Sequence, residues 1–146
     1  MDEWKEIKTQ QDIDELLDVY GDFHDGCLVK AAFQSGAGVD DKLSMGFGVD
    51  GDYTLLATFE RQWRPKTLEM KFIGLRRCHL VGYEENYLPL LFEAYLSFSE
   101  NLLPGAPKRV IVWSDVPFDP VAPFNRFEEP GESYIIANNL QWRVIE

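Results

Sequence analysis

The chain has 146 residues, of which 45% are hydrophobic and 14% aromatic. This length suits one domain, and the apolar content exceeds that of disordered chains, so we expect a single domain over residues 1–146 that folds without disulfides. Twenty-five acidic residues against fourteen Lys and Arg give a net charge of −11, which disfavours nucleic acid as a partner, and no apolar run is long enough to span a bilayer.

The first predicted element is an amphipathic helix that begins at Thr9–Asp12 and ends before Gly21. Thr9 is a suitable N-cap, nearby acids favour the positive end of the helix dipole, and Gly21 occupies the usual position of a terminating glycine. Apolar residues recur at helical spacing, at Ile13, Leu16, Leu17 and Tyr20. This face is expected to pack on a sheet.

From residue 28 the apolar period changes from 3.6 to 2, which indicates strands. Alternation predicts strands within 29–33, 43–49, 55–59 and 68–72, and the last of these is expected to be followed by more sheet through 76–81. Turn residues at 35–41, Asp50-Gly51-Asp52 and Arg64-Pro65-Lys66 separate the strands. Because the connections are short, the four strands are expected to form an antiparallel meander.

Residues 83–103 fit both helical and strand periodicity. We favour a strand at 92–99, because Pro89 interrupts a helix and the strand predicted at 110–113 needs a neighbour, with 104–107 closing the hairpin. Residues 115–132 carry four prolines and predict an irregular loop. The C-terminal segment predicts a final strand or a hairpin bent at Asn138-Asn139.

These elements predict an α+β fold. Its main part is an antiparallel meander, and the sequence leaves open whether this sheet is curled or sandwich-like. One N-terminal amphipathic helix packs on it.

The best candidate site is the turn Asp22-Phe23-His24-Asp25-Gly26-Cys27, between the helix and the first strand. A histidine flanked by carboxylates can act as a general base or a metal ligand. The alternative, which we favour, is that Asp25 holds the turn and the imidazole shields the helix C-terminus.

Metal and cofactor sites are not expected. Cys78 and His79 are adjacent on a predicted strand, so their side chains point to opposite faces and cannot join His24 at one zinc ion. Cys27 and Cys78 are expected to be reduced, small buried hydrophobes. Ser114-Asp115 could supply a nucleophile and an acid, but the geometry of a triad cannot be read from the sequence.

Residues 61–82 hold six bases and one acid. We expect the bases to be solvated charges of a hairpin that neutralise the acidic flanks: Arg61, Arg64, Lys66, Lys71, Arg76 and Arg77. Trp113 and Trp142 are expected to anchor either the core or a partner surface, with the core favoured.

Four short motifs occur in a suggestive order: Phe23-His24-Asp25-Gly26, the strand region 68–81, Val110 to Asp115, and Tyr134 to Ala137 with Gln141-Trp142-Arg143. This order resembles a loose group of small bacterial proteins with an F-H-D turn and a closing W-R, some of them similar to immunity protein 50. The resemblance implies no catalytic role and no cofactor. It directs attention to His24, Asp25, Trp113, Asp115, Trp142 and Arg143 as one cluster, to which Asp22 is added as a neighbouring binding residue.

Taken together, these patterns favour a cytoplasmic, non-enzymatic acidic module that binds a basic protein, in the manner of an immunity-type inhibitor. The acids of 12–25 and 40–52 would contact the partner. The cytoplasmic expectation comes from the acidic N-terminus, which lacks the pattern of a secretory signal. Two alternatives stay open: a small hydrolase or lyase that uses His24 with Asp25, and a structural domain without a dedicated ligand.

Overall fold

A computed structural model describes residues 3–82, 90–117 and 133–145. The described elements are, in chain order, β1 (Lys5–Ile7), α1 (Gln10–Val19), the 3-10 turn η1 (Gly21–Phe23), β2 (Gly26–Gln34), β3 (Gly38–Val39), β4 (Met45–Gly46), the 3-10 turn η2 (Asp50–Asp52), β5 (Thr54–Arg61), β6 (Thr67–His79), β7 (Tyr95–Glu100), β8 (Arg109–Ser114) and β9 (Tyr134–Ile145).

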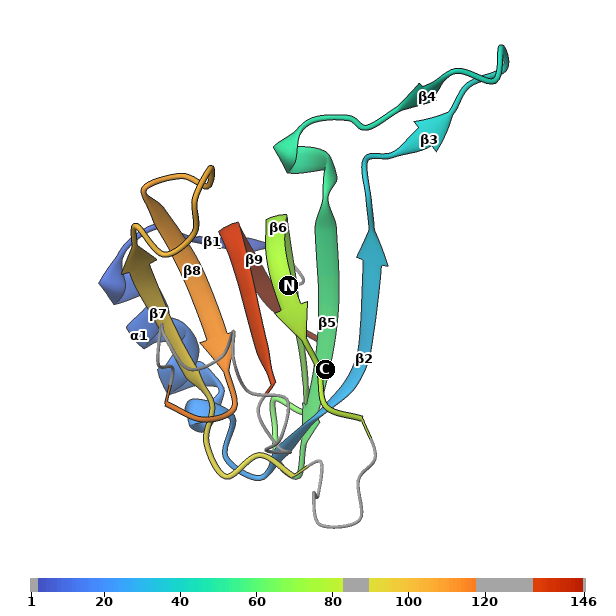
Figure 1. Cartoon of the computed structure of the whole chain (residues 1–146). Helices are drawn as coiled ribbons and strands as arrows, with labels where there is room; N and C mark the ends of the chain where they lie inside the picture. The colour runs from blue at the N-terminus through green and yellow to red at the C-terminus, as the bar shows by residue number, and fades with distance from the viewer. Residues whose placement is uncertain (1–2, 83–89, 118–132, 146) are drawn as a thin grey trace.

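The predicted α+β class is confirmed, because one antiparallel sheet carries most of these elements (Figure 1). Its strand order is β2-β5-β6-β9-β8-β7, with β1 also paired to β9. β9 is the central strand: β6 pairs along one side of it, while β8 and β1 share the other side. The sheet is open: among the described strands, β2 and β7 stand at the two ends of this order, and β1 pairs on one side only.

The predicted helix is confirmed as α1. The Thr9 Oγ1 accepts a hydrogen bond from the Asp12 backbone N–H (3.2 Å), and the Asp12 carboxylate accepts one from the Thr9 N–H (3.0 Å), which forms a capping box. Ile13, Leu16 and Tyr20 are fully buried. Figure 1 shows α1 behind the β7–β8 side of the sheet, so its apolar stripe covers that part of one sheet face.

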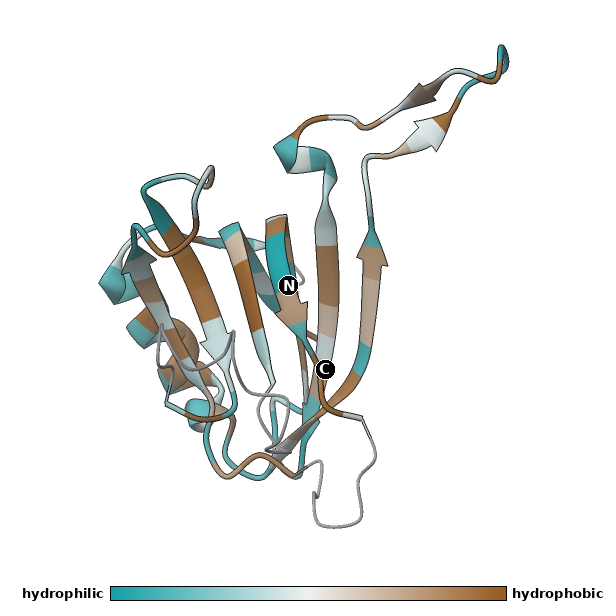
Figure 2. Cartoon of the chain, viewed as in Figure 1, coloured by the Kyte–Doolittle hydropathy of each residue, from teal (hydrophilic) through white to brown (hydrophobic). Residues whose placement is uncertain are grey.

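The buried apolar residues form two clusters. The smaller consists of Val110, Val112, Tyr134 and Ile136. The larger lies between this sheet face and α1, where apolar positions of the strands coincide (Figure 2). Phe23 is at its centre, with ring centroids 5.0 Å from Phe59, 5.3 Å from Tyr20 and 6.2 Å from Trp113. Trp113 and Trp142 are 1% and 2% exposed, which confirms the core interpretation for both. Such aromatic packing contributes beyond the area it buries.

The four-strand meander is wrong in one respect. β2 pairs directly with β5, and the segment expected as a strand at 43–49 leaves the sheet with β3 to form a separate two-stranded hairpin. At the C-terminus, β9 is one continuous strand of 12 residues rather than a hairpin bent at Asn138-Asn139. Its pairing with the long β6 continues on both sides of the two asparagines.

The strand preferred within 92–99 is confirmed as β7, which pairs with β8 through the hairpin expected at 104–107. Most of the predicted loop at 115–132, and residues 83–89, lie outside the described residues. Both cysteines are free thiols, as expected, but their predicted burial is wrong: Cys27 is half-buried and Cys78 exposed. Cys27 lies on an edge strand, and Cys78 lies where β6 extends past the residues that pair with β5.

Candidate functional site

The turn that carries His24 has an unusual backbone. Asp22, Phe23 and Asp25 have φ values of +55°, +66° and +57°, in the left-handed region that non-glycine residues rarely adopt. Such a conformation is typically unfavourable by about 1–3 kcal/mol per residue and persists only where the surroundings impose it. Here the fully buried Phe23 ring imposes it, because the ring is fixed among Tyr20, Phe59 and Trp113.

Backbone hydrogen bonds tie this turn to the segment before β7. The Asp25 N–H donates to the Leu91 carbonyl (2.9 Å), the Leu91 N–H donates to the Gly26 carbonyl (2.8 Å), and the Ala94 N–H donates to the Asp22 carbonyl (2.9 Å). The His24 side chain adds a fourth link, because Nδ1 lies 2.7 Å from the Phe92 carbonyl oxygen. The turn is therefore rigid on both sides of His24.

The surroundings of His24 define what it can do. A carbonyl oxygen only accepts, so Nδ1 carries the proton and donates to Phe92. Nε2 lies 3.5 Å from a carboxylate oxygen of Asp25, and the ring is 6.3 Å from the Trp63 ring. The His24 side chain is 54% exposed. The imidazole is thus a solvent-facing group with a fixed orientation, and two cavities of about 350 and 250 Å³ elsewhere in the molecule include none of these residues.

The group that shields the helix C-terminus is Arg61 rather than His24. Arg61 is 7% exposed, and its guanidinium donates to the carbonyl oxygens of Val19 (3.3 Å), Arg64 (3.0 Å) and Pro65 (2.8 Å). It also lies 4.4 Å from the centroid of the Tyr20 ring. The prediction that the basic stretch is solvated is therefore wrong for Arg61, because the end of α1 presents carbonyl groups that need a cation.

The residues grouped by the family resemblance do not form one cluster. His24 and Asp25 are at the surface turn, Trp113 and Trp142 are in the core, and Asp115 accepts a hydrogen bond from the Ser133 N–H (2.9 Å). Arg143 follows Trp142 on β9, so the two side chains point to opposite faces. The Arg143 Nε lies 2.7 Å from a Glu69 carboxylate oxygen, and its guanidinium carbon lies 4.3 Å from the Trp4 ring centroid. Whether any of them binds a partner stays a prediction.

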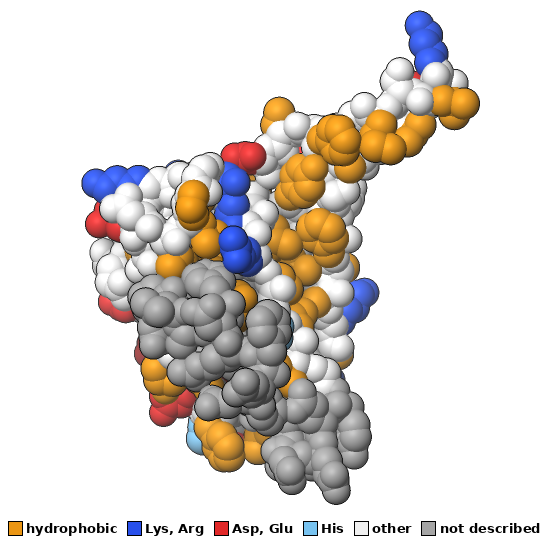
Figure 3. All heavy atoms as spheres, in the orientation of Figure 1, with side chains coloured by type: hydrophobic (Ala, Val, Ile, Leu, Met, Phe, Trp, Pro, Cys, Tyr) orange, Lys and Arg blue, Asp and Glu red, His pale blue; other side chains and the backbone are white. Residues whose placement is uncertain are grey.

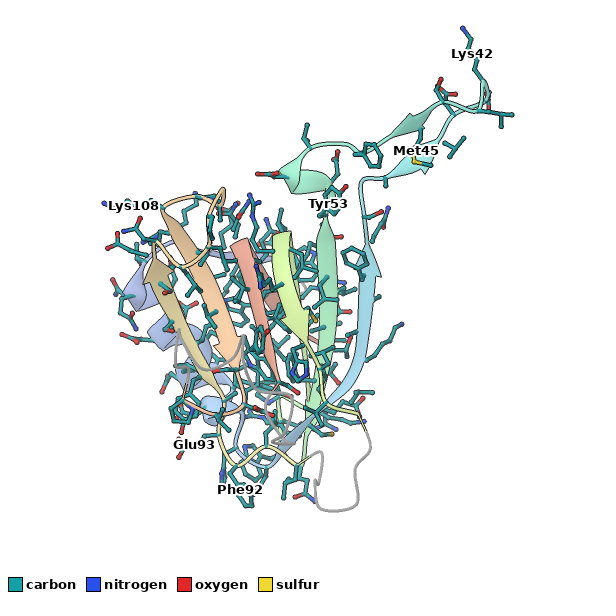
Figure 4. The ribbon with its side chains drawn as sticks, viewed as in Figure 1. Lys42, Met45, Tyr53, Phe92, Glu93 and Lys108 are labelled. Carbon is teal, nitrogen blue, oxygen red and sulfur yellow. The ribbon has the colours of Figure 1, made fainter. Side chains whose placement is uncertain are left out.

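A continuous stretch of exposed apolar side chains in the described residues includes the segment 43–49, which the sequence interpretation assigned to the sheet. We name residues 37–52 the arm; it contains β3, β4 and η2, and all its residues are exposed. Figures 3 and 4 show it projecting from the end of β2 and β5, with hydrophobic side chains along it. Its large apolar residues are 56–84% exposed: Val39, Leu43, Met45, Phe47 and Val49.

The base of the arm is fixed to the sheet. The Tyr53 hydroxyl donates to the Phe47 carbonyl (2.7 Å), and the Asp52 carboxylate accepts from the Val49 N–H (2.9 Å). Asp50 forms a 2.6 Å ion pair with Arg76 of β6, whose Nε donates to the Asn138 side chain of β9 (2.8 Å). The cavity of about 350 Å³ lies in this corner. The arm therefore projects from an anchored base.

The arm also carries acidic charge. It contains four acids and one base, namely Asp40, Asp41, Asp50, Asp52 and Lys42. Asp40 holds the tip, where its carboxylate accepts hydrogen bonds from the Lys42 and Ser44 N–H groups (2.8 and 3.0 Å). The acids thus lie at the tip and at the base of the arm, on both sides of its exposed apolar residues, and Asp50 at the base is paired with Arg76.

Glycine spacing is the signal that could have identified the arm. Residues 43–49 alternate apolar side chains with Ser44, Gly46 and Gly48, so one face of the expected strand has little to pack. Gly48 has a φ of +67°, and a Cβ on Gly36 would lie 2.7 Å from the Asp52 Cβ. These glycines allow the two arm segments to cross closely where they leave the sheet.

Within the described ranges, no group of three or more His, Cys, Asp or Glu side chains could hold a metal ion. In the same ranges, no helix is long and apolar enough to cross a membrane. Comparison of the chain with protein-family models, curated proteins and solved structures gave no match.

Proposed function

We propose that this chain is a non-enzymatic protein-binding module that engages its partner through the arm. The observation that carries the proposal is the exposure of five large apolar side chains, by 56–84%, on a segment whose base is anchored to the sheet. Exposed apolar surface of this kind is typical of interaction sites in soluble proteins. A two-stranded hairpin is also marginally stable alone, so the arm gains order when a partner covers it.

The charge of the arm and of the whole chain specifies the partner's chemistry. The arm places acids on both sides of its apolar residues, and the chain has a net charge of −11. A complementary partner is apolar at the centre of its binding surface and basic at the rim. The net charge would also accelerate association with a basic protein at low salt. The resemblance to immunity protein 50-like proteins points to the same class, a protein that acts by occupying a partner.

The first experiment identifies the partner in the cells that produce the chain. A photoreactive amino acid replaces Phe47 on the arm in one variant and Ser97, an exposed residue of the distant strand β7, in a control variant. We expect a cross-linked basic protein from position 47 and none from position 97. Equal cross-linking from both positions, or none from position 47, would contradict the proposal.

The second experiment measures the affinity of the purified complex by titration calorimetry. The double variant Met45→Ser/Phe47→Ser removes two apolar contacts, each of which contributes about 1–2 kcal/mol to binding. We therefore expect it to bind at least tenfold more weakly than the wild type. Phe92→Ser is the matched control, because Phe92 is 74% exposed but lies outside the arm. Binding should weaken further as salt is raised from about 50 to 500 mM. An arm variant with the affinity of the wild type would refute the proposal.

A further inference from the structure

The edge of β2 is open for most of its length. One side of β2 pairs with β5, and on the other side Gly26 is bridged by Leu91. Beyond that bridge, in the described part of the chain, no strand pairs with residues 28–34 on this side. Residues 29–34 are all exposed, and Val29 and Phe33 are 53% and 59% exposed. A β-bulge shifts the pairing with β5 between Leu28 and Lys30, so the regular part of this edge is residues 30–34. An edge strand with exposed apolar side chains is a template for another strand.

We propose that a second copy of this chain adds to this edge, with the two β2 strands antiparallel about a two-fold axis. In an antiparallel pair, directly opposite residues have their side chains on the same face of the sheet. A two-fold axis perpendicular to the sheet therefore passes midway between one residue and the same residue of the second copy. The central positions of the open edge are Ala31 and Ala32. An axis at Ala31 places Lys30 opposite Ala32, and an axis at Ala32 places Lys30 opposite Gln34.

Self-pairing is therefore compatible with the charges of β2. Lys30 is the only charged residue between positions 26 and 39, and neither register places it opposite its own copy. Its side chain projects from a sheet face and leaves the edge hydrogen-bonding groups accessible. The rest of a chain with a net charge of −11 repels a second copy, whereas this edge contains no acid. Phe33 meets an apolar residue in either register, Val29 or Ala31.

The size of the contact predicts a weak dimer. At most seven residues on each side make the contact, far fewer than the roughly 20–30 per partner that bury the ~800 Å² typical of stable complexes. We therefore expect a dissociation constant in the micromolar range or above. The arms leave from the Gln34 ends, so antiparallel pairing places them at opposite ends of the joined strands. The inference rests on the β2 edge and is independent of the arm's proposed partner.

Engineered disulfides test this geometry without any partner protein. Opposite residues of an antiparallel pair have Cα atoms about 4.5–5.5 Å apart, within the range that a disulfide spans. Ala31→Cys and Ala32→Cys are each made in a Cys27→Ser/Cys78→Ser background, and Ser97→Cys on the other edge strand is the control. We expect one of the two β2 variants to form covalent dimers at least fivefold faster than the control on mild oxidation. Rates equal to the control in both would overturn the proposal.

Sedimentation of the unmodified chain gives an independent readout. We expect the mass to rise from 16.8 kDa toward twice that value as concentration increases to about 1 mM. Phe33→Lys should abolish the rise because it places an ammonium group against the apolar Val29 or Ala31 of the second copy. The circular-dichroism melting curve should be unchanged, since Phe33 is exposed. A wild-type mass that stays at 16.8 kDa, or a Phe33→Lys variant that dimerises as the wild type does, would overturn the proposal.

Discussion

Replacement of Arg61 by alanine should strongly destabilise the fold, although it lies in a stretch that appears hydrophilic in the sequence. The guanidinium donates to three backbone carbonyl oxygens at 2.8–3.3 Å and stacks on the Tyr20 ring. A hydrogen bond from a charged donor contributes at least about 1.5 kcal/mol, and a cation at a helix C-terminus about 0.5–1 kcal/mol. Allowing for water that reaches the freed carbonyls, we expect a loss of about 4 kcal/mol.

The assay is urea unfolding followed by tryptophan fluorescence and far-ultraviolet circular dichroism. A loss of about 4 kcal/mol corresponds to a melting temperature lower by roughly 8–16 °C for a domain of this size. Arg61→Lys should restore only part of the stability, because a single ammonium does not reproduce the guanidinium fork. Lys66→Ala is the control: its exposed 3.9 Å ion pair with Glu60 predicts a change within about 0.5 kcal/mol. An Arg61→Ala loss below about 1.5 kcal/mol would refute the reasoning.

Three further predictions concern local geometry. Thr9→Ala should lower the free energy of unfolding by about 1 kcal/mol through loss of the N-cap, and urea titrations matching the wild type would contradict this role. Hydrogen bonds from the Lys8 and Thr9 backbone N–H groups hold the pKa of Asp12 below its ordinary value of 3.8. The stability that Asp12 contributes is therefore complete above pH 3.8 and is lost as the pH falls through the lowered pKa. The difference in melting temperature between wild type and Asp12→Ala should shrink from pH 7 to pH 3, and a constant difference would count against this role of Asp12. Gly74→Ala should lower the free energy of unfolding by at least about 2 kcal/mol, because φ is +71° and the new Cβ overlaps the Asn138 side chain. Gly105 has a similar φ of +76° but open space around it, so Gly105→Ala should lower the free energy of unfolding by about 1 kcal/mol. Equal losses would exclude the steric explanation.

A His24→Ala variant distinguishes the proposed protein-binding module from the enzyme alternative. His24→Ala removes a half-exposed side chain with one backbone contact, so the melting temperature should change by no more than a few degrees. Partner binding through the arm should also be unchanged, since His24 lies outside it. Loss of a measurable turnover at unchanged stability would instead favour the hydrolase or lyase interpretation.

Local chemistry in the sequence determined the helix and most of the strands. Thr9, the spacing of Ile13, Leu16 and Tyr20, and Gly21 act within one helix, so their effect can be read without knowing the rest of the fold. Strand alternation likewise identified β5 and β6, because period-2 burial is a property of a strand with one face on a core. The continuous apolar run at 110–113 predicted β8, which is buried on both faces. The position of the His24 turn, between the helix and the first long strand, followed from these elements.

Tertiary structure decided which strands became neighbours and which charges became buried. Residues 43–49 have the alternation of a sheet strand, but β5 took the place beside β2, so their apolar side chains remained in solvent on the arm. In the sequence, Arg61 cannot be distinguished from the exposed bases around it, because its burial depends on contact with the end of α1. Both outcomes depend on contacts between residues distant in sequence, where packing and hydrogen-bond satisfaction override local pattern.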